Sequence, residues 1–350
     1  MSVQRTAEPT LEAVRHAREA IEYCYERGWT DGLPVVPPAE EFVEEFLAVV
    51  DRDPDEVVIE QEHLGRKCTV RLAAANAVMA GCKPEYFPVV LAALEALNRL
   101  PGSRGLLQST TGQAVFVVVN GPIRNQLGFN TKDNLFSPGD RPNATVGRAI
   151  RLVIMNALGI RPHEFDQSTH GQPGKFSLCI AENEEESPWD PLHVERGFAR
   201  DESTVTVGLV RGTMQVEQRD SKEPEVILET IADSMSYAGT YFPTPRGHAG
   251  IVVMGPEHAQ LIAEAGWSKA RAREYLWEHF GRPAGLLRRL AKGALLDPSL
   301  PDDAFVRFAH SPETILIVVA GARNAGISTV CPTFIGQQVT VPIRMKSTSH

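Results

Sequence analysis

The stretch AGIVVMGPE, residues 249–257, decides the fold class of this 350-residue chain. Its continuous run of apolar residues predicts a buried strand, and the Gly-Pro-Glu that follows at once predicts the start of a helix. Similar apolar runs occur at 314–319 (TILIVV) and 114–119 (AVFVVV). Strands that are apolar throughout and alternate with helices are typical of sheets covered by helices. The sequence therefore predicts an α/β fold with mixed, mainly parallel sheets.

Outward from these strands, apolar spacing and turn residues predict the remaining elements. Helices are expected over residues 9–28, 39–50, 69–80, 84–98, 143–158, 223–235, 268–280 and 284–292. Further strands are expected at 57–59, at 176–181 and on both sides of Gly212 within 203–217. The chain changes from loop-rich to regular α/β alternation near residues 198–203. We therefore expect an N-terminal lobe with long polar loops, residues 1–200, and a C-terminal lobe, residues 201–350.

A weak internal similarity links three of the predicted strands. FVVVNGP at 116–122 resembles IVVMGP at 251–256, and LIVVAG at 316–321 is a third strand with small residues at its exit. Each exit places a loop at the carboxyl end of a strand, where open α/β sheets usually bind ligands. Three short matches fit either an internal duplication or the residue pattern that buried parallel strands commonly share, and both interpretations stay open.

The charge and hydropathy of the chain argue against several classes of function. A net charge of −9 disfavours broad nucleic-acid binding, which needs a basic surface. No apolar run reaches the ~18 residues of a membrane helix, so no membrane partner is expected. The start of the chain lacks the charged head and apolar core of a secretion signal. We expect a small-molecule substrate as the partner, and a homodimer as the assembly.

Cysteine usage indicates a reducing compartment. The chain has five cysteines, an odd number, at wide spacings and without a CxxC pair. This pattern favours free thiols in the cytoplasm over a framework of disulfides. The five positions are Cys24, Cys68, Cys82, Cys179 and Cys331.

The segment 123–183 has the residue composition of a binding site. It is crowded with hydrogen-bonding and charged side chains around one predicted helix, which Asn143 is expected to cap. Cations near a helix start can hold a carboxylate or a phosphate. The predicted anion-binding and hydrogen-bonding residues are Asn125, Asn130, Asn134, Arg141, Asn143, Arg148 and Lys175.

Four residues are candidates for catalytic chemistry. His170 lies in a glycine-containing loop, and an imidazole there can transfer a proton near neutral pH. Cys82 lies just before a predicted helix start, whose dipole would favour a thiolate, whereas Cys331 follows the last core strand. Glu182 abuts the end of the 176–181 strand and can enter a pocket. Each of these residues can also be read as an ordinary core or surface residue.

A metal site is an alternative interpretation. His170 and His193, with a carboxylate such as Glu182, would supply suitable ligands, although the chain has no HExxH motif or clustered histidines. No GxGxxG fingerprint follows a strand, and no GxSxG elbow occurs. The sequence therefore names no cofactor and predicts no metal in its leading interpretation.

Part of the chain resembles a known family. GWTDGLPVVPP at 28–38 resembles a stretch in proteins of the UGSC-like family, named for a selenocysteine-or-cysteine, Gly, Ser, Cys motif. GCKPEYFPVVLAALEAL at 81–97 and AGARNAG at 320–326 are similar to segments of larger relatives. The CGSC motif itself does not occur here. The resemblance implies a soluble α/β protein of a small-molecule pathway and supplies no catalytic assignment.

Three functions remain open from the sequence. The leading prediction is an enzyme of lyase or hydrolase type that acts on a small carboxylate- or phosphate-bearing substrate without redox chemistry. A cysteine nucleophile or acid would assist a histidine in this reaction. The alternatives are a metal-dependent enzyme and a ligand-binding protein without chemistry.

Overall fold

The computed structural model describes residues 10–237, 239, 241, 243, 247–333 and 337–346. The helices are α1 (Leu11–Glu26), α2 (Glu40–Leu47), α3 (Val70–Ala80), α4 (Phe87–Arg99), α5 (Ser103–Leu106), α6 (Ile123–Gln126), α7 (Arg141–Asn156), α8 (Leu192–Glu195), α9 (Pro224–Met235), α10 (Pro256–Glu264), α11 (Lys269–His279) and α12 (Ala284–Arg289). The strands are β1 (Val57–Gln61), β2 (Arg66–Thr69), β3 (Ala114–Asn120), β4 (Cys179–Ala181), β5 (Thr204–Val210), β6 (Met214–Glu217), β7 (Gly250–Met254), β8 (Gly281–Pro283), β9 (Phe305–Arg307), β10 (Ile315–Val319), β11 (Ile327–Pro332) and β12 (Val339–Pro342).

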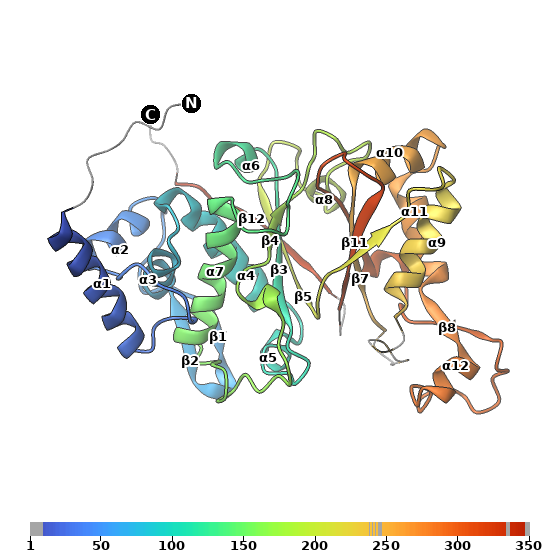
Figure 1. Ribbon diagram of the computed structural model, residues 1–350, viewed down its shortest axis with the longest axis horizontal. Helices are drawn as coiled ribbons and strands as arrows, with labels where there is room; N and C mark the ends of the chain where they lie inside the picture. The colour runs from blue at the N-terminus through green and yellow to red at the C-terminus, as the bar shows by residue number, and fades with distance from the viewer. Residues whose placement is uncertain are drawn as a thin grey trace.

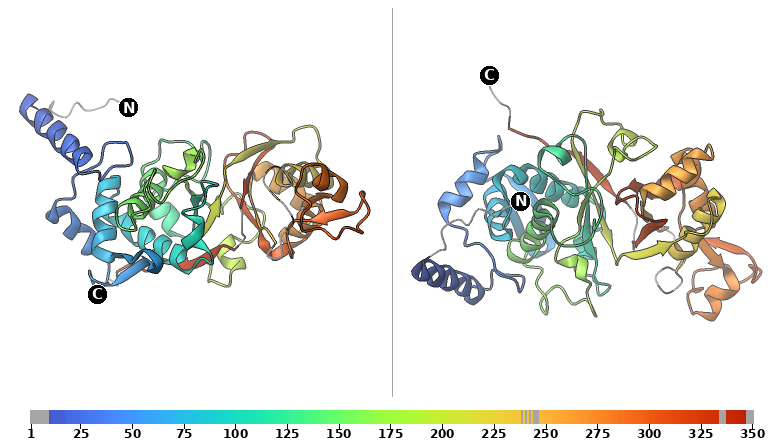
Figure 2. Two further views of the ribbon diagram at one scale, coloured as in Figure 1. Left: turned by 90° about the horizontal axis from the view of Figure 1, so that it is seen from below. Right: turned by 45° about the horizontal axis from the view of Figure 1, so that its top comes forward.

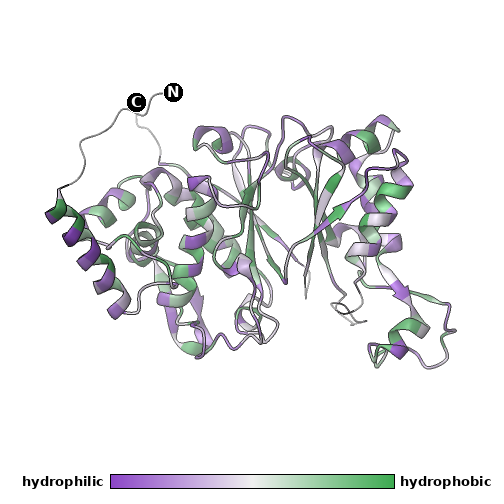
Figure 3. Cartoon of the chain, viewed as in Figure 1, coloured by the Kyte–Doolittle hydropathy of each residue, from purple (hydrophilic) through white to green (hydrophobic). Residues whose placement is uncertain are grey.

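The body of the molecule has four layers, two sheets enclosed between two groups of helices (Figure 1). Within the described residues, the first sheet has the order β12-β5-β3-β4 and the second has the order β10-β7-β11-β6. Helices α4 and α7 cover the first sheet and α3 packs against α7, whereas α9, α10 and α11 cover the second sheet. Hydrophobic colour concentrates on the strands and on the helix faces turned toward them (Figure 3).

Side-chain alternation explains why the central strands are apolar throughout. In β3, Val117 and Val119 join the core beneath the helices, whereas Phe116 and Val118 face the second sheet. Residues of the second sheet such as Ile251 pack against them, so the two inner faces form one apolar layer. Both faces of each sheet are therefore buried, one by helices and one by the other sheet.

The predicted α/β fold with mixed, helix-covered sheets is confirmed. The pairing within each sheet differs from the mainly parallel arrangement that we expected. Each sheet contains a parallel pair, β3 with β4 and β7 with β10, and its other pairings are antiparallel. An apolar run reports burial on both faces, and a second sheet can supply that burial as well as a second helix layer can.

The two sheets exchange strands. The chain passes from β5 in the first sheet to β6 in the second, and it later returns from β11 in the second sheet to β12 in the first. An isolated bridge between Val210 and Thr333 joins the two crossing segments. Residues 201–350, suggested by the sequence as a second lobe, therefore contribute strands to both sheets.

The strand order reveals a repeat that the sequence only hinted at. Strands β3, β4, β5 and β6 form a parallel pair, then an antiparallel neighbour, then a strand that crosses to the other sheet. Strands β7, β10, β11 and β12 follow the same order. The similar segments 116–122 and 251–256 thus lie at corresponding positions of the two halves. This correspondence favours a structural repeat as the origin of their similarity.

Helix α1 stands apart from the layered body (Figure 2). All of its residues are described, and Cys24 alone among them is buried. The helix contacts the loop that follows it, where the rings of Tyr23 and Trp29 meet edge to face at 5.8 Å. Within the described residues, no helix is long and apolar enough to cross a membrane.

Candidate functional site

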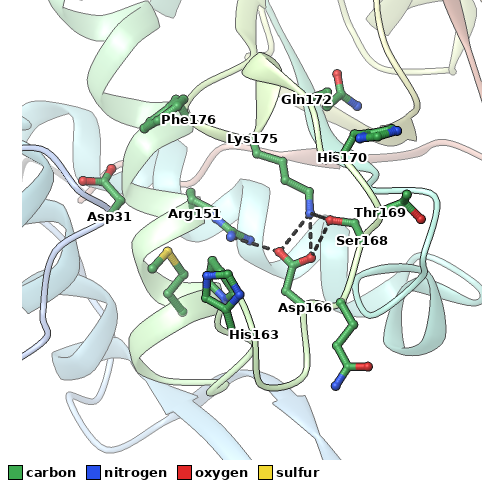
Figure 4. Close-up of a pocket in the computed structure, with 14 residues that line it drawn as sticks. Asp31, Arg151, His163, Asp166, Ser168, Thr169, His170, Gln172, Lys175 and Phe176 are labelled. Atoms are coloured by element: carbon green, nitrogen blue, oxygen red, sulfur yellow. Dashed lines mark hydrogen bonds and ion pairs between the residues drawn. The ribbon is translucent and has the colours of Figure 1, made fainter.

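A cavity of about 670 Å³ lies between α7 and the loop over residues 162–176 (Figure 4). The loop that precedes α2 contributes Asp31 to one wall. A volume of this size suits a small organic molecule. The polar and charged groups that define its chemistry are Arg151, His163, Asp166, Ser168, His170 and Lys175.

Two cations converge on one buried carboxylate at the wall of this cavity. The Lys175 ammonium lies 2.7 and 2.8 Å from the two Asp166 oxygens, and Arg151 Nη2 donates to Asp166 at 3.0 Å. Ser168 Oγ donates to the same carboxylate at 3.0 Å and accepts from Lys175 Nζ at 3.0 Å. Figure 4 shows both cationic side chains pointing toward Asp166. The cluster therefore carries one positive charge in excess.

The ionisation of Asp166 follows from these contacts. Burial opposes ionisation, but the hydrogen bonds and charge of Lys175 and the charge of Arg151 outweigh that effect. The pKa of Asp166 consequently lies below its usual value. The carboxylate stays charged at neutral pH, and it holds the two cations in fixed positions at the cavity wall.

The loop that carries His170 is anchored to the end of the first sheet at which β3 begins and β5 ends. Gln172 Nε2 donates to the carbonyl oxygen of Val210 at 2.7 Å, and Thr169 N donates to the carbonyl oxygen of Thr110 at 3.0 Å. A Cβ atom at Gly112 would lie 2.8 Å from the backbone of this loop, so only glycine permits the approach. His170 itself is exposed at the cavity wall. The structure thus brings the predicted residues His170 and Lys175 to one cavity.

Arg148 is committed to another part of the chain. Its guanidinium binds both oxygens of Asp31 at 2.8 Å and donates to the carbonyl oxygen of Pro34 at 2.9 Å. These contacts fasten the segment 28–38 to α7. Burial opposes ionisation of Asp31, but its bonds to Arg148 prevail and lower the pKa of this carboxyl. The expectation that Arg148 holds a substrate anion is therefore replaced by a structural role.

Arg141 and Asn143 also serve the fold. Gly81 ends α3 in the left-handed conformation, with φ 82°, and Arg141 Nε donates to its carbonyl oxygen at 3.0 Å. Helix α7 begins at Arg141, so Asn143 is not its N-cap as we expected. The buried Asn143 amide instead binds the Asn130 backbone and the carbonyl oxygen of Cys179.

The other predicted asparagines lie away from His170 and bind their own surroundings. Asn125 donates to Glu185 Oε1 at 3.0 Å, and Asn130 closes a local turn through the carbonyl oxygen of Asp133. Asn134 adopts a positive φ of 56° and lines a separate cavity of about 370 Å³ at the carboxyl ends of β7 and β10. These three predicted binding residues therefore do not line the cavity that holds His170.

The two predicted catalytic thiols are buried and do not line the cavity that holds His170. Cys82 is buried against α7, with Sγ 3.3 Å from the carbonyl oxygen of Thr145, and burial raises the pKa of its thiol to about 12. Cys331 is buried between the sheets, and burial raises its pKa to about 12 as well. Nearby cations lower the pKa of Cys82 by less than burial raises it. Both thiols remain protonated at neutral pH.

Glu182 and His193 lie at the opposite end of β3 from His170. Glu182 is fully buried, accepts from Asn120 Nδ2 and accepts from Leu192 N at 2.8 Å. Burial raises the pKa of Glu182 despite the charge of Lys269 and these hydrogen bonds. Because β3 is about 20 Å long, His170 lies too far from Glu182 and His193 to bind the same metal ion. Among the described residues, no three His, Cys, Asp or Glu side chains gather to hold a metal ion.

Several residues of the cavity were missed by sequence reasoning. Arg151 lies three residues after Arg148, so the two arginines lie near one another on α7, and this spacing was an available signal. No sequence pattern identified His163 and Ser168, because the positions of side chains in such loops depend on contacts with distant parts of the chain. Comparison with protein-family models and with curated proteins finds no match to this chain. The resemblance to the UGSC-like family therefore stays a prediction.

Proposed function

We propose that the cavity beside α7 binds a small molecule bearing a carboxylate or phosphate, and that His170 transfers a proton in a lyase or hydrolase reaction. The observation that carries this proposal is the cluster of Lys175 and Arg151 around the single carboxylate of Asp166. One positive charge remains uncompensated there, within a cavity of about 670 Å³. A partly buried excess charge of this kind attracts an anion.

The donors of the cluster can serve a ligand without breaking its central ion pair. Lys175 uses one of its contacts on the hydroxyl of Ser168, which a ligand oxygen can replace. Arg151 meets Asp166 through Nη2, and a guanidinium has five N–H donors in a planar fork. Asp166 holds both cations in place, so little ordering is needed when the anion enters.

His170 is the proton-transfer group in this proposal. Its imidazole lines the same cavity. It belongs to a loop that is hydrogen-bonded to the first sheet where β5 ends. An imidazole can act as acid or base near neutral pH, which lyase and hydrolase reactions both require. The buried thiols take no part, so the reaction does not pass through a cysteine adduct.

Calorimetric titration with inorganic phosphate and with malonate tests the binding step. The wild-type chain is expected to bind one of them, and Arg151→Gln should weaken that affinity by about tenfold or more. Lys132→Gln is the matched control, because Lys132 is an exposed cation outside this cavity. This variant should bind the anion with the affinity of the wild type. Equal affinities of wild type and Arg151→Gln would contradict the proposal.

The catalytic step has its own test. Turnover of a panel of phosphate esters and carboxylates, followed by NMR, should disappear in His170→Ala while anion binding persists. Retained turnover in His170→Ala would show that another group transfers the proton.

A ligand-binding protein without chemistry is the second candidate. The side chains of Lys175, Asp166 and Ser168 bind one another through hydrogen bonds. This arrangement favours a binding protein, because none of the three is a free nucleophile. In that case the wild type binds the anion, and His170→Ala changes neither binding nor any measured conversion.

A further inference from the structure

We propose that α1 pairs with the α1 of a second copy of this chain, antiparallel and about a twofold axis. The first turns of this helix expose large apolar groups, with Leu11 67% and Val14 48% exposed. Its contacts with the body are concentrated at its C-terminal end, where Tyr25 Oη donates to the carbonyl oxygen of Gly32 at 3.4 Å. Among the described residues, none packs as a core against the N-terminal half of this helix.

The stability of α1 argues for a partner. Isolated helices of this length are marginal in water, because most helix stability in proteins comes from packing an apolar face. Thr10 caps α1 by accepting from Ala13 N at 3.2 Å, but one cap contributes only about 1 kcal/mol. A helix that is regular over 16 residues and covered only at one end is therefore suited to packing against another surface.

The sequence of α1 has the spacing of a helix–helix seam. Leu11, Val14, Ile21 and Tyr25 recur at intervals of three, seven and four residues, which places them on one stripe. Leu11 and Val14 are exposed, whereas Ile21 and Tyr25 are half-buried. Arg18 occupies the remaining position of the stripe, where its aliphatic stem can cover apolar surface while the guanidinium reaches solvent. The stripe is narrow, as expected for a pair of helices.

The charges of α1 select a second copy in antiparallel orientation. Arg15 and Glu22 flank the stripe on the same side, seven residues apart. In an antiparallel pair, Arg15 of each copy lies opposite Glu22 of the other, so the twofold axis produces the ion pair twice. In a parallel pair the two copies of this flank would lie on opposite sides of the seam, so Arg15 would not reach Glu22 of the other copy. The helix is thus complementary to itself.

The position of α1 permits this arrangement. Both views in Figure 2 show the helix projecting beyond the layered body. A second copy can approach its exposed side without displacing the sheets or the helices that cover them. The paired helices would then form a small interface, for which we expect reversible, concentration-dependent association.

Sedimentation velocity over a wide range of protein concentrations tests the proposal. The wild-type chain should associate to twice the mass of one chain. Arg15→Glu and Glu22→Arg should each weaken the association by about tenfold, because two attractive pairs become repulsive. The double variant R15E/E22R restores opposite charges and should recover most of the wild-type affinity. Far-UV circular dichroism checks that every variant keeps its helices.

Glu19→Arg is the matched control for Glu22→Arg. Both changes reverse one charge on α1, and both replace a glutamate four residues after an arginine, but Glu19 lies away from the flank of the stripe. Its association should stay within about twofold of the wild type. The proposal is overturned by a wild type that remains monomeric, by a double variant as weak as the single ones, or by equal effects of the two glutamate substitutions.

Discussion

At the scale of single residues, burial rather than local sequence decides the chemistry of the thiols. Cys82 lies beside Arg141, yet burial raises the pKa of its thiol to about 12. Burial likewise raises the pKa of the Cys331 and Cys179 thiols. A position near a helix start is not enough to produce a thiolate when the sulfur has lost its contact with water.

We therefore predict that the cysteines of the folded chain resist alkylation. Iodoacetamide at neutral pH should leave Cys82, Cys179 and Cys331 unmodified, because the thiolate is the reactive form and these thiols are buried and protonated. The same treatment in guanidinium chloride should modify all five cysteines. Mass spectrometry of the intact protein and of its peptides measures both outcomes. Stoichiometric labelling of native Cys82 would refute this prediction.

Asp166 gives a second prediction at this scale. Asp166→Asn leaves Lys175 and Arg151 close together without a carboxylate, which should lower the free energy of unfolding by about 2–4 kcal/mol at neutral pH. The pKa of Asp166 is lower in the folded than in the unfolded chain, so its stabilisation is complete above the unfolded value. It is lost as the pH falls through the folded value.

Urea denaturation of the wild type and Asp166→Asn at several pH values measures this effect. The difference in unfolding free energy should be constant near neutrality and should shrink below about pH 4. A difference that stays the same into the acid range would mean that the carboxylate contributes through packing rather than through its charge.

At the scale of elements, the sequence predicted where strands and helices lie better than how they pair. The apolar runs at 249–254 and 314–319 correspond to β7 and β10 within one residue. Their direction relative to β11 depends on the strand order β10-β7-β11, which no local pattern encodes. Likewise, His170 and Lys175 were found from their loop composition, whereas the partner of Arg148 lies more than a hundred residues away. Contacts over such distances follow from topology, and a single sequence does not give them.

The link between Arg148 and Asp31 yields a prediction about one segment. Arg148→Gln should lower the free energy of unfolding by about 2–4 kcal/mol, because it removes one member of a largely buried ion pair. Hydrogen exchange should increase over residues 29–36, which the guanidinium fastens to α7. Arg141→Gln provides the comparison, since Arg141 binds two carbonyl oxygens at the surface and should cost less than about 1 kcal/mol. Unchanged exchange over 29–36 in Arg148→Gln would contradict this role.

At the scale of the whole molecule, each repeat completes the sheet of the other. The first repeat supplies β6 to the second sheet, and the second repeat supplies β12 to the first. The apolar layer between the sheets draws on both, with Phe116 from β3 and Ile251 from β7. Neither sheet has its full set of strands without the other repeat, so the two halves should be coupled in folding.

This coupling predicts one cooperative unfolding transition for both sheets. Phe116→Ala and Ile251→Ala lie in different sheets but in the same apolar layer, and each should lower the free energy of unfolding by about 2–5 kcal/mol. In each variant, the fluorescence of Trp29, beside the first helix layer, and of Trp277, beside the second, should shift to the same urea midpoint. Variants that retain one of these tryptophans separate the two signals. Two midpoints that move independently would show that the sheets unfold as separate units despite the exchanged strands.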